Sequence, residues 1–439
     1  MASRFNRSCS PFSFLLTPGA CKAPAKNINP SSAPRLALFV LFVTAASQLP
    51  AQMMLKPSQP GEPVTLLPSD LAILEAGQER KDLPCTVTQR KPDLGFDLRF
   101  HGGFDVTVPL QELAGDGQLL TVVFRVRPDD NPQHPSYFVQ HFNVPVIEED
   151  AKGEAMLQGA IDMGEGSYHV DWLMRDRDER LCSSSWDVAA ALSPKDKPIP
   201  LFISKDQVAE MAPQPFVNDV PTAEQKKDEN LSVKLLVNFA PQSAGSAALQ
   251  RSDTDALVSI LKTIERDPRV TRVSLVAFNL TEGRVVYRQE SADQIDFPAL
   301  GKALQTMKLG TVNIAKLNQK HSETDFLQNL ISTEVGTPSH PDAVIFAGPK
   351  AMLDADVPQD DLRKMGDVDC PVFYMNYILN PQATPWKDSI SHAIKTFKGV
   401  EYTISRPRDL WFSTSEMFSR ILRSKRDKSL ALAATGASR

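Results

Sequence analysis

The chain has 439 residues, a length that exceeds one ordinary hydrophobic core and suffices for two domains. Its formal net charge at pH 7 is −5, so no strong field favours nucleic acid or an anionic membrane surface. Hydrophobic residues make up 42% of the chain, an ordinary share for a globular protein. Composition therefore predicts a globular, two-domain protein with no nucleic-acid partner.

Residues 1–52 are predicted to be an export signal. Arg35 precedes the apolar run Leu36–Ala46, which is shorter than the ~18–20 residues of a membrane span. Small residues follow, so cleavage is expected near Ala46 or Ala51. This pattern predicts a periplasmic or secreted protein with no transmembrane segment in the mature chain. An uncleaved anchor and a cytosolic protein are the alternatives.

Residues 53–84 are predicted to be a tether, with a short helix over Leu71–Ala76 that Ser69 or Asp70 would cap. Residues 85–200 are predicted to be all-β, because apolar and polar residues alternate with a period of two. The alternating runs are Phe96–Phe100, Phe104–Val108, Leu120–Val126, Tyr168–Met174 and Cys182–Val188. Turn-forming residues interrupt these runs, and about seven short strands at such spacing favour a β-sandwich.

Gly166–Val170 resembles the start of a late strand in an immunoglobulin-like sandwich, where a tyrosine hydroxyl ties back a corner. Tyr168 would be that tyrosine. The predicted fold of this domain is therefore an immunoglobulin-like β-sandwich.

The chain has five cysteines and no C-x-x-C pair, which argues against zinc. Cys85 opens the first predicted strand of the sandwich and Cys182 lies in the last one. In an oxidising compartment these two could form a disulfide, but two separate buried thiols remain the alternative. Cys370 precedes an apolar run and is predicted to be a buried thiol.

Residues 201–230 are predicted to be a linker, since they contain Pro213, Pro215, Pro221 and a charged run. Strand and helix patterns then alternate through residues 231–424, which predicts a doubly wound, Rossmann-type α/β domain. The predicted strands are Val233–Phe239, Val273–Asn279, Arg284–Gln289, Ala343–Ala347, Pro371–Tyr377 and Val400–Ile404. The predicted helices are Asp253–Arg266, Pro298–Lys308, Glu323–Val335, Gln359–Met365, Trp386–Lys398 and Leu410–Arg423. Residues 425–439 are predicted to be a disordered tail.

The order of these elements resembles that of von Willebrand factor A-type domains. Leu231–Pro241 resembles the first strand and loop of that family, Val273–Asn279 its second long strand, and Arg284–Gln289 its edge hairpin. Ala343–Pro349 resembles the fourth strand and the loop that follows. Secreted acidobacterial proteins with divergent versions of this domain are similar in layout.

The family often holds a divalent cation above the sheet, which requires several oxygen ligands, some of them charged. The resemblance places Asn238, Ala240 and Gln242 where the first loop supplies Asp-x-Ser-x-Ser, and Gly348 where a later Asp would stand. Thr311 alone matches, in the threonine-bearing loop. The sequence therefore predicts a domain without a metal or other cofactor.

The rim of the predicted sheet remains a natural binding crevice, because open α/β sheets bind ligands at the carboxyl ends of their strands. The candidate rim residues are Asn238, Gln242, Ser243, Thr311, Asn313, Gly348 and Lys350. Four aromatic residues in this half of the chain either pack in the core or form a partner-binding patch: Tyr374, Tyr377, Trp386 and Trp411.

The chain contains none of the common nucleophile, phosphate-loop, dinucleotide or zinc-protease motifs. We therefore expect an exported, non-catalytic protein that binds another protein or an envelope polymer. Two alternatives stay open. One is an enzyme or carbohydrate-binding protein with a site between the two domains, and the other is a structural component of an envelope assembly.

Overall fold

The computed structural model describes residues 52–55, 66–211, 215–218, 230–243, 246–309, 321–336, 341–364 and 368–436. The predicted export signal, except Gln52, lies outside the described residues. Within the described ranges, no helix combines the length and apolar character needed to cross a membrane. These described residues form a mixed α+β structure with three sheets.

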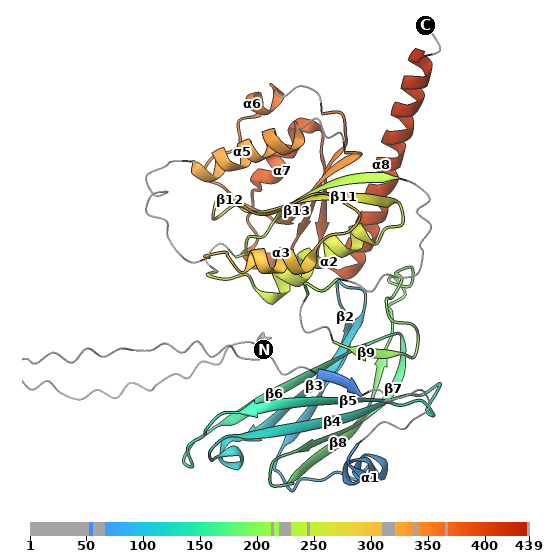
Figure 1. Ribbon diagram of the computed structural model, residues 1–439, viewed down its shortest axis with the longest axis vertical. Helices are drawn as coiled ribbons and strands as arrows, with labels where there is room; N and C mark the ends of the chain where they lie inside the picture. Colours follow the sequence, from blue (N-terminus) through green and yellow to red (C-terminus); the bar gives the residue numbers. More distant parts are fainter. Residues whose placement is uncertain are drawn as a thin grey trace, which may run out of the picture. The chain divides into compact units, whose positions relative to one another are not determined.

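Two antiparallel sheets form a β-rich, sandwich-like unit, called here the sandwich unit (Figure 1). The five-stranded sheet has the order β1 (Gln52–Leu55), β5 (Ser136–Val144), β4 (Gln118–Pro128), β7 (Gly166–Arg175) and β8 (Leu181–Ala190). The four-stranded sheet has the order β2 (Thr86–Leu94), β3 (Phe100–Pro109), β6 (Glu154–Met163) and β9 (Val208–Glu210). One apolar core contains residues from both sheets, so their inner faces pack together.

Aromatic rings occupy the centre of this core. The ring of Phe104 on β3 contacts Phe124 on β4 and Trp172 on β7 edge to face, with centroids 5.5 and 5.4 Å apart. All three side chains are almost fully buried. These contacts join the inner faces of the two sheets. The three rings point inward because apolar and polar residues alternate with a period of two along these strands.

Tyr168 closes a corner of the sandwich unit. Its hydroxyl donates a hydrogen bond to the backbone oxygen of Gly164, four residues upstream, at 2.9 Å. The same hydroxyl oxygen lies 3.2 Å from the backbone oxygen of Gln207. The side chain therefore ties back the β6–β7 turn, in the manner of the tyrosine corner that the sequence suggested.

The predicted tether, residues 53–84, needs correction because parts of it belong to the sandwich unit. β1 pairs with β5 along four residues. Helix α1 (Pro68–Ala76) begins earlier than predicted, with Leu67 as its N-cap residue, so neither Ser69 nor Asp70 caps it. Its Leu74 packs on the outer face of the five-stranded sheet, and Asp70 forms an ion pair with Arg175 on β7.

The strand predicted over Phe96–Phe100 is also corrected, because residues 95–99 form the turn between β2 and β3. The run Phe104–Val108 is not a separate strand that begins after Gly102 and Gly103, since β3 runs through both glycines. A Cβ atom at Gly103 would lie 2.1 Å from the backbone oxygen of Gly159 on β6. The glycine therefore permits close strand pairing rather than ending a strand.

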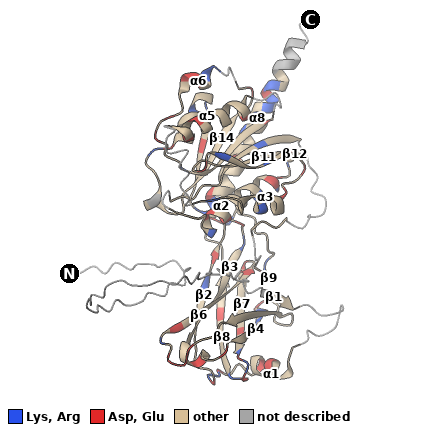
Figure 2. Cartoon of the chain, turned by 60° about the vertical axis from the view of Figure 1, so that its left-hand side comes forward, with Lys and Arg blue, Asp and Glu red and all other residues tan. Residues whose placement is uncertain are grey.

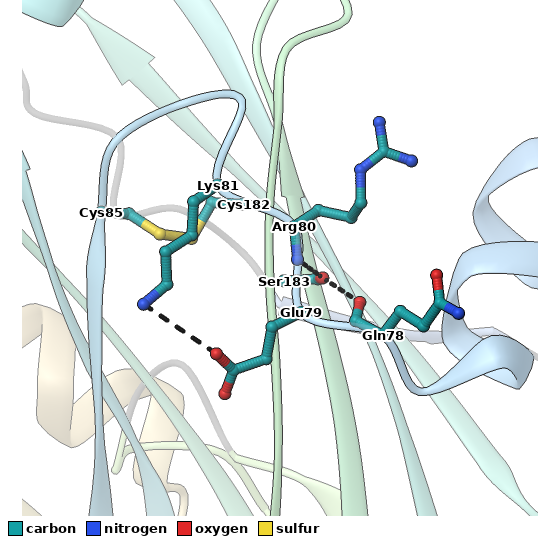
Figure 3. Close-up of a disulfide and its surroundings, with 7 residues drawn as sticks. All are labelled: Gln78, Glu79, Arg80, Lys81, Cys85, Cys182 and Ser183. Atoms are coloured by element: carbon teal, nitrogen blue, oxygen red, sulfur yellow. Dashed lines mark hydrogen bonds and ion pairs between the residues drawn. A yellow bond between two sulfur atoms is a disulfide. The ribbon is translucent and has the colours of Figure 1, made fainter.

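A disulfide joins Cys85, which precedes β2, to Cys182 on β8, with Cα atoms 6.3 Å apart. It links an edge of the four-stranded sheet to an edge of the five-stranded sheet. Figure 3 shows a second tie beside it: Arg80 donates its N–H to Ser183 Oγ at 2.8 Å, and that hydroxyl donates to the backbone oxygen of Gln78 at 3.0 Å. The segment that leads into β2 is thus fixed to β8.

The predicted linker, residues 201–230, is also partly structured. β9 lies within it and pairs with β6. Residues 215–218 pack on the helices of the following α/β unit, where a Cβ atom at Gly301 would lie 2.8 Å from Phe216. Lys262 Nζ donates to the backbone oxygen of Val217 at 2.9 Å. Residues 219–229 lie outside the described residues.

The α/β unit contains a six-stranded sheet that is parallel except for one antiparallel edge strand, β12. Its order is β12 (Arg284–Ala292), β11 (Val270–Asn279), β10 (Leu231–Asn238), β13 (Ala343–Pro349), β14 (Val372–Tyr377) and β15 (Val400–Ile404). One face packs on α2 (Arg251–Glu265), α3 (Phe297–Leu304) and α8 (Pro407–Gly436), and the other on α5 (Ser322–Val335), α6 (Gln359–Arg363) and α7 (Ser389–Ile394) (Figure 1). The near-continuous burial of β10, β13 and β14 follows from this two-sided cover.

The predicted disordered tail, residues 425–439, is corrected because α8 continues to Gly436. The stretch after Arg423 is rich in Lys, Arg, Ala and Leu, whose intrinsic propensities favour helix, and Lys425 pairs with Asp342 at 3.0 Å. Acidic and basic residues are interspersed along both units, in keeping with the near-balanced charge (Figure 2).

The disulfide should stabilise the sandwich unit. Replacing both Cys85 and Cys182 by Ala is expected to lower the free energy of unfolding by about 2–4 kcal/mol, because a long loop is no longer closed in the unfolded chain. Chemical denaturation measures this loss, and Cys370→Ala, which removes an unpaired cysteine, is the matched control. Peptide mapping without reductant should recover Cys85 joined to Cys182. Free thiols at both positions in protein purified from an oxidising compartment would contradict the bridge.

Candidate functional site

The carboxyl ends of the parallel strands form one edge of the α/β sheet. The strand order reverses at β10, because β11 lies on one side of it and β13 on the other. Ligands of open α/β sheets bind at such a reversal, outside the carboxyl ends. Three loops at this edge are named by the preceding strand: the β10 loop (its described residues 239–243 and 246–250), the β13 loop (residues 350–358) and the β14 loop (residues 378–388).

Gln242 joins the β10 loop to the β14 loop. Its Nε2 donates to the backbone oxygen of Asn380 at 2.9 Å and to Thr384 Oγ1 at 3.0 Å. Its Oε1 accepts the N–H groups of Leu379 at 3.1 Å and Asn380 at 3.2 Å. The side chain is only 7% exposed, so its amide is a structural tie rather than an available ligand.

The β13 loop is joined to the β14 loop and the start of α7. Asp388 accepts the N–H of Ala351 at 3.3 Å, and Ser389 donates its N–H to the oxygen of Ala351 at 2.8 Å. Leu353 donates its N–H to Ser389 Oγ at 3.1 Å. The three rim loops are therefore held together by hydrogen bonds that involve both side chains and backbone, which gives a preorganised edge.

Two fully buried asparagines flank Gly348 at the level of the strand ends. Gly348 pairs with Asn376 in register, and a Cβ atom added to it would lie 2.8 Å from the Cβ of Asn238. Asn238 Oδ1 accepts the N–H of Leu280 at 3.2 Å, and Asn376 Nδ2 donates to Glu401 at 2.7 Å. Among the described residues, Asn238 Nδ2 and Asn376 Oδ1 have no partner. Asn238 Nδ2 is therefore a donor, and Asn376 Oδ1 an acceptor, that is not used within the described residues.

Charged groups lie next to this pair. Glu401 accepts from Ser391 Oγ at 2.5 Å and pairs with Lys350 Nζ at 3.7 Å. Burial raises the pKa of Asp388 to about 6, and the negative charge of Glu401 adds to the effect, while backbone N–H donors oppose it. The edge therefore carries one carboxyl group that titrates near neutral pH.

The structure brings together some of the predicted rim residues. Asn238 and Gly348 touch, Lys350 follows them on the β13 loop, and Ser243 is exposed on the β10 loop. Thr311 and Asn313 lie outside the described residues. Gln242 is corrected from a binding residue to a tie between loops, because all its polar atoms are already bonded within the protein.

Sequence reasoning missed Asn376, Asp388 and Glu401. Asn376 offered a signal, since it is the one amide in the apolar run Val372–Tyr377. Asp388 and Glu401 offered none, because only the fold brings them to the edge. Of the aromatic residues, Tyr374 and Tyr377 are fully buried core residues, whereas Trp386 is 87% exposed.

A second charged cluster lies in the sandwich unit, in the β2–β3 turn and on β3 and β6. His101 contacts Asp162 through Nδ1 at 2.7 Å and Asp97 through Nε2 at 3.0 Å, and Arg99 contacts Asp162 at 3.1 Å. Potential ligand atoms of Asp97, His101 and Asp162 lie within 4.8 Å of one another. Two cations already balance the two carboxylates, and both ring nitrogens are engaged, so the cluster has the composition of an ion network rather than a metal site.

The protonation of His101 follows from this network. Burial lowers the pKa of His101, but its hydrogen bonds to Asp162 and Asp97 and their charges outweigh burial and raise the pKa to about 10. The imidazolium therefore persists at neutral pH in the folded chain.

Comparisons with known proteins add little. No protein-family model matches the chain, and no curated protein matches it. Among solved structures, a mutant of the PilB minor pilin from Streptococcus sanguinis is 8% identical, with a TM-score of 0.26, covering 71% of this chain and 88% of the pilin. A glycosyl hydrolase family 2 member from Bacteroides cellulosilyticus is 10% identical, with a TM-score of 0.18, covering 74% of this chain and 39% of the hydrolase. Likenesses at these TM-scores carry no argument about fold or function.

Substituting the glycine between the asparagines should strain the edge. Gly348→Ala is expected to lower the free energy of unfolding by about 1–3 kcal/mol, because the new methyl group meets Asn238 and its backbone oxygen. Urea denaturation measures the change. The double variant, Asn238→Gly with Gly348→Ala, should lose less stability than the sum of the two single variants, because the methyl group no longer meets the Asn238 side chain. An unchanged midpoint for Gly348→Ala would show that the edge has room there.

The ion network should make stability depend on pH. A His pKa raised from 6.5 to about 10 contributes stability that is fully present below pH 6.5 and is lost as pH rises through 10. His101→Gln is expected to cost about 2–4 kcal/mol at pH 6, with a smaller difference from wild type at pH 10. His134→Gln is the control, since that ring bonds the Asn131 amide rather than a carboxylate. A pH-independent difference would contradict the assignment.

Proposed function

We propose that the protein is an exported, non-catalytic binding protein whose α/β unit is a metal-independent, von Willebrand factor A-like domain. The strand order, the single antiparallel edge strand and the helices on both faces support this layout. The binding surface would be the carboxyl edge, where the three rim loops meet.

The hydrogen bonds of the Gln242 side chain are the main observation in support of metal independence. The resemblance places this side chain at a cation-ligand position, but its oxygen accepts two backbone N–H groups and its nitrogen donates twice within the protein. Asn238 is similarly occupied, because its oxygen accepts the N–H of Leu280. A hard cation at this edge would have to break these bonds, with only Thr311 matching the family's ligands.

A preorganised edge also suits binding. Loops that are already ordered lose little conformational entropy when a partner docks, so more of the contact energy appears as affinity. The disulfide fits export, because such bonds persist in oxidising compartments.

Titration calorimetry tests metal independence. Adding Mg²⁺, Mn²⁺ or Ca²⁺ to the full exported chain should produce no saturable heat and no thermal stabilisation. Capture of a partner from the native envelope fraction should be equal in Mg²⁺ and in chelator. A sub-millimolar binding curve that Thr311→Ala abolishes would overturn the metal-free assignment.

A further inference from the structure

A cavity lies on the face of the α/β sheet that packs on α2 and α3 (Figure 1). Its volume is about 590 Å³, within the ~300–1,000 Å³ range of small-molecule sites in proteins. Its walls come from residues 215–216, from the β10 loop, from α2 and α3, and from the residues that follow α3. The large apolar side chains of this cavity, called here the α3 cavity, are Phe216, Leu249, Leu304, Met307 and Leu309. Segments that are distant in the chain thus line one largely apolar space.

Phe216 forms one wall of the α3 cavity and is held against α3. A Cβ atom at Gly301, inside α3, would lie 2.8 Å from the Phe216 side chain. Glycine weakens the interior of a helix, so its presence here leaves room for the ring. Asn218 Oδ1 accepts the N–H of Phe297, at the start of α3, at 3.3 Å. This wall is therefore ordered before a ligand arrives, which reduces the entropic cost of binding.

The β10 loop forms another wall, and hydrogen bonds hold it next to α2. Ser246 Oγ donates to the backbone oxygen of Ala248 at 2.7 Å and accepts from Gln250 Nε2 at 3.2 Å. Thr254 Oγ1, on α2, donates to the backbone oxygen of Gln250 at 3.3 Å. These bonds fix the part of the loop that carries Leu249.

One positive charge lies among the described lining residues. The polar side chains of the lining are Thr254, Lys302 and Gln305, and no acidic residue belongs to it. The Lys302 side chain is exposed, and within the described part of the chain its ammonium group pairs with no carboxylate. Apolar walls beside one unpaired cation favour a ligand with an apolar body and a single negative charge.

We propose that the α3 cavity binds the anion of a fatty acid, with the acyl chain between Phe216 and Leu249 and the carboxylate paired with Lys302. This inference goes beyond the proposed function, because it assigns a small-molecule site that needs no partner at the carboxyl edge. A ligand with several negative charges would lack matching cations here, whereas a single carboxylate is matched by one ammonium group.

Calorimetric titration of the intact chain with laurate, kept below the concentration at which it forms micelles, tests the proposal. Wild type should bind one laurate per chain saturably, and laurate should raise the melting temperature. Lys302→Gln should weaken laurate binding about 3–5-fold, as expected for the loss of one partly solvated ion pair. Lys195→Gln, which removes the same charge from an exposed lysine between β8 and β9, is the matched control and should bind laurate like wild type.

Two further measurements separate the apolar body of the ligand from its charge. Dodecanol has the same chain length without the carboxylate, so Lys302→Gln should bind it as wild type does. Ala247→Trp, which adds an indole to the exposed lining, should weaken binding of both ligands at least 10-fold. Because Ala247 and Lys302 are exposed, both variants should keep the wild-type melting temperature when no ligand is present.

The site would be overturned by the absence of saturable laurate binding, by equal laurate binding to wild type and Lys302→Gln, or by binding that Ala247→Trp leaves intact. Laurate binding that Lys195→Gln weakens as much as Lys302→Gln would reveal a general effect of surface charge, and it would overturn the assignment as well.

Discussion

The hydrogen bonds of the Gln242 side-chain amide are the interaction on which the arrangement of loops at the carboxyl edge depends. Parallel strands deliver their loops to one edge, but nothing in the sheet itself fixes one loop against another. One buried amide that donates twice and accepts twice supplies that constraint between the loops after β10 and β14. Asp388 and Ser389 extend the constraint to the loop after β13. Hydrogen bonds within the protein thus hold the three loops of this edge against one another.

Much of the α/β unit was predictable because its apolar strands and amphipathic helices alternate clearly along the chain. Leu257, Ile260, Leu261 and Ile264, for example, fall on one side of α2 and are all fully buried. The expectations failed where local pattern and tertiary contact disagree. Phe96–Phe100 alternates like a strand, yet it includes a tight turn with Leu98 at a φ of 62°.

The candidate site was harder to predict than the fold. Its position at the strand ends followed from topology alone, but the roles of individual side chains did not. The resemblance suggested a ligand position for Gln242, whereas the side chain ties two loops together. Its partners come from a loop more than a hundred residues later, which local sequence does not reveal. Asn376 and Glu401 meet only across neighbouring strands. Short-range sequence patterns carry no information about such pairings.

Ionisation of Asp388, whose pKa is raised, has opposite effects on the order of the rim loops and on the stability of the α/β unit. At neutral pH the ionised carboxylate accepts the backbone N–H groups of Ala351 and Ile390 as a stronger, charge-assisted acceptor. Burial of that same charge weakens the fold. Because the pKa in the folded chain is about 6, above the ordinary value, the contribution of this group to stability falls as the pH rises through 6. The loops at the rim are thus held most firmly at a pH where this carboxyl group contributes least to the stability of the unit. An acidic surrounding reverses both effects together.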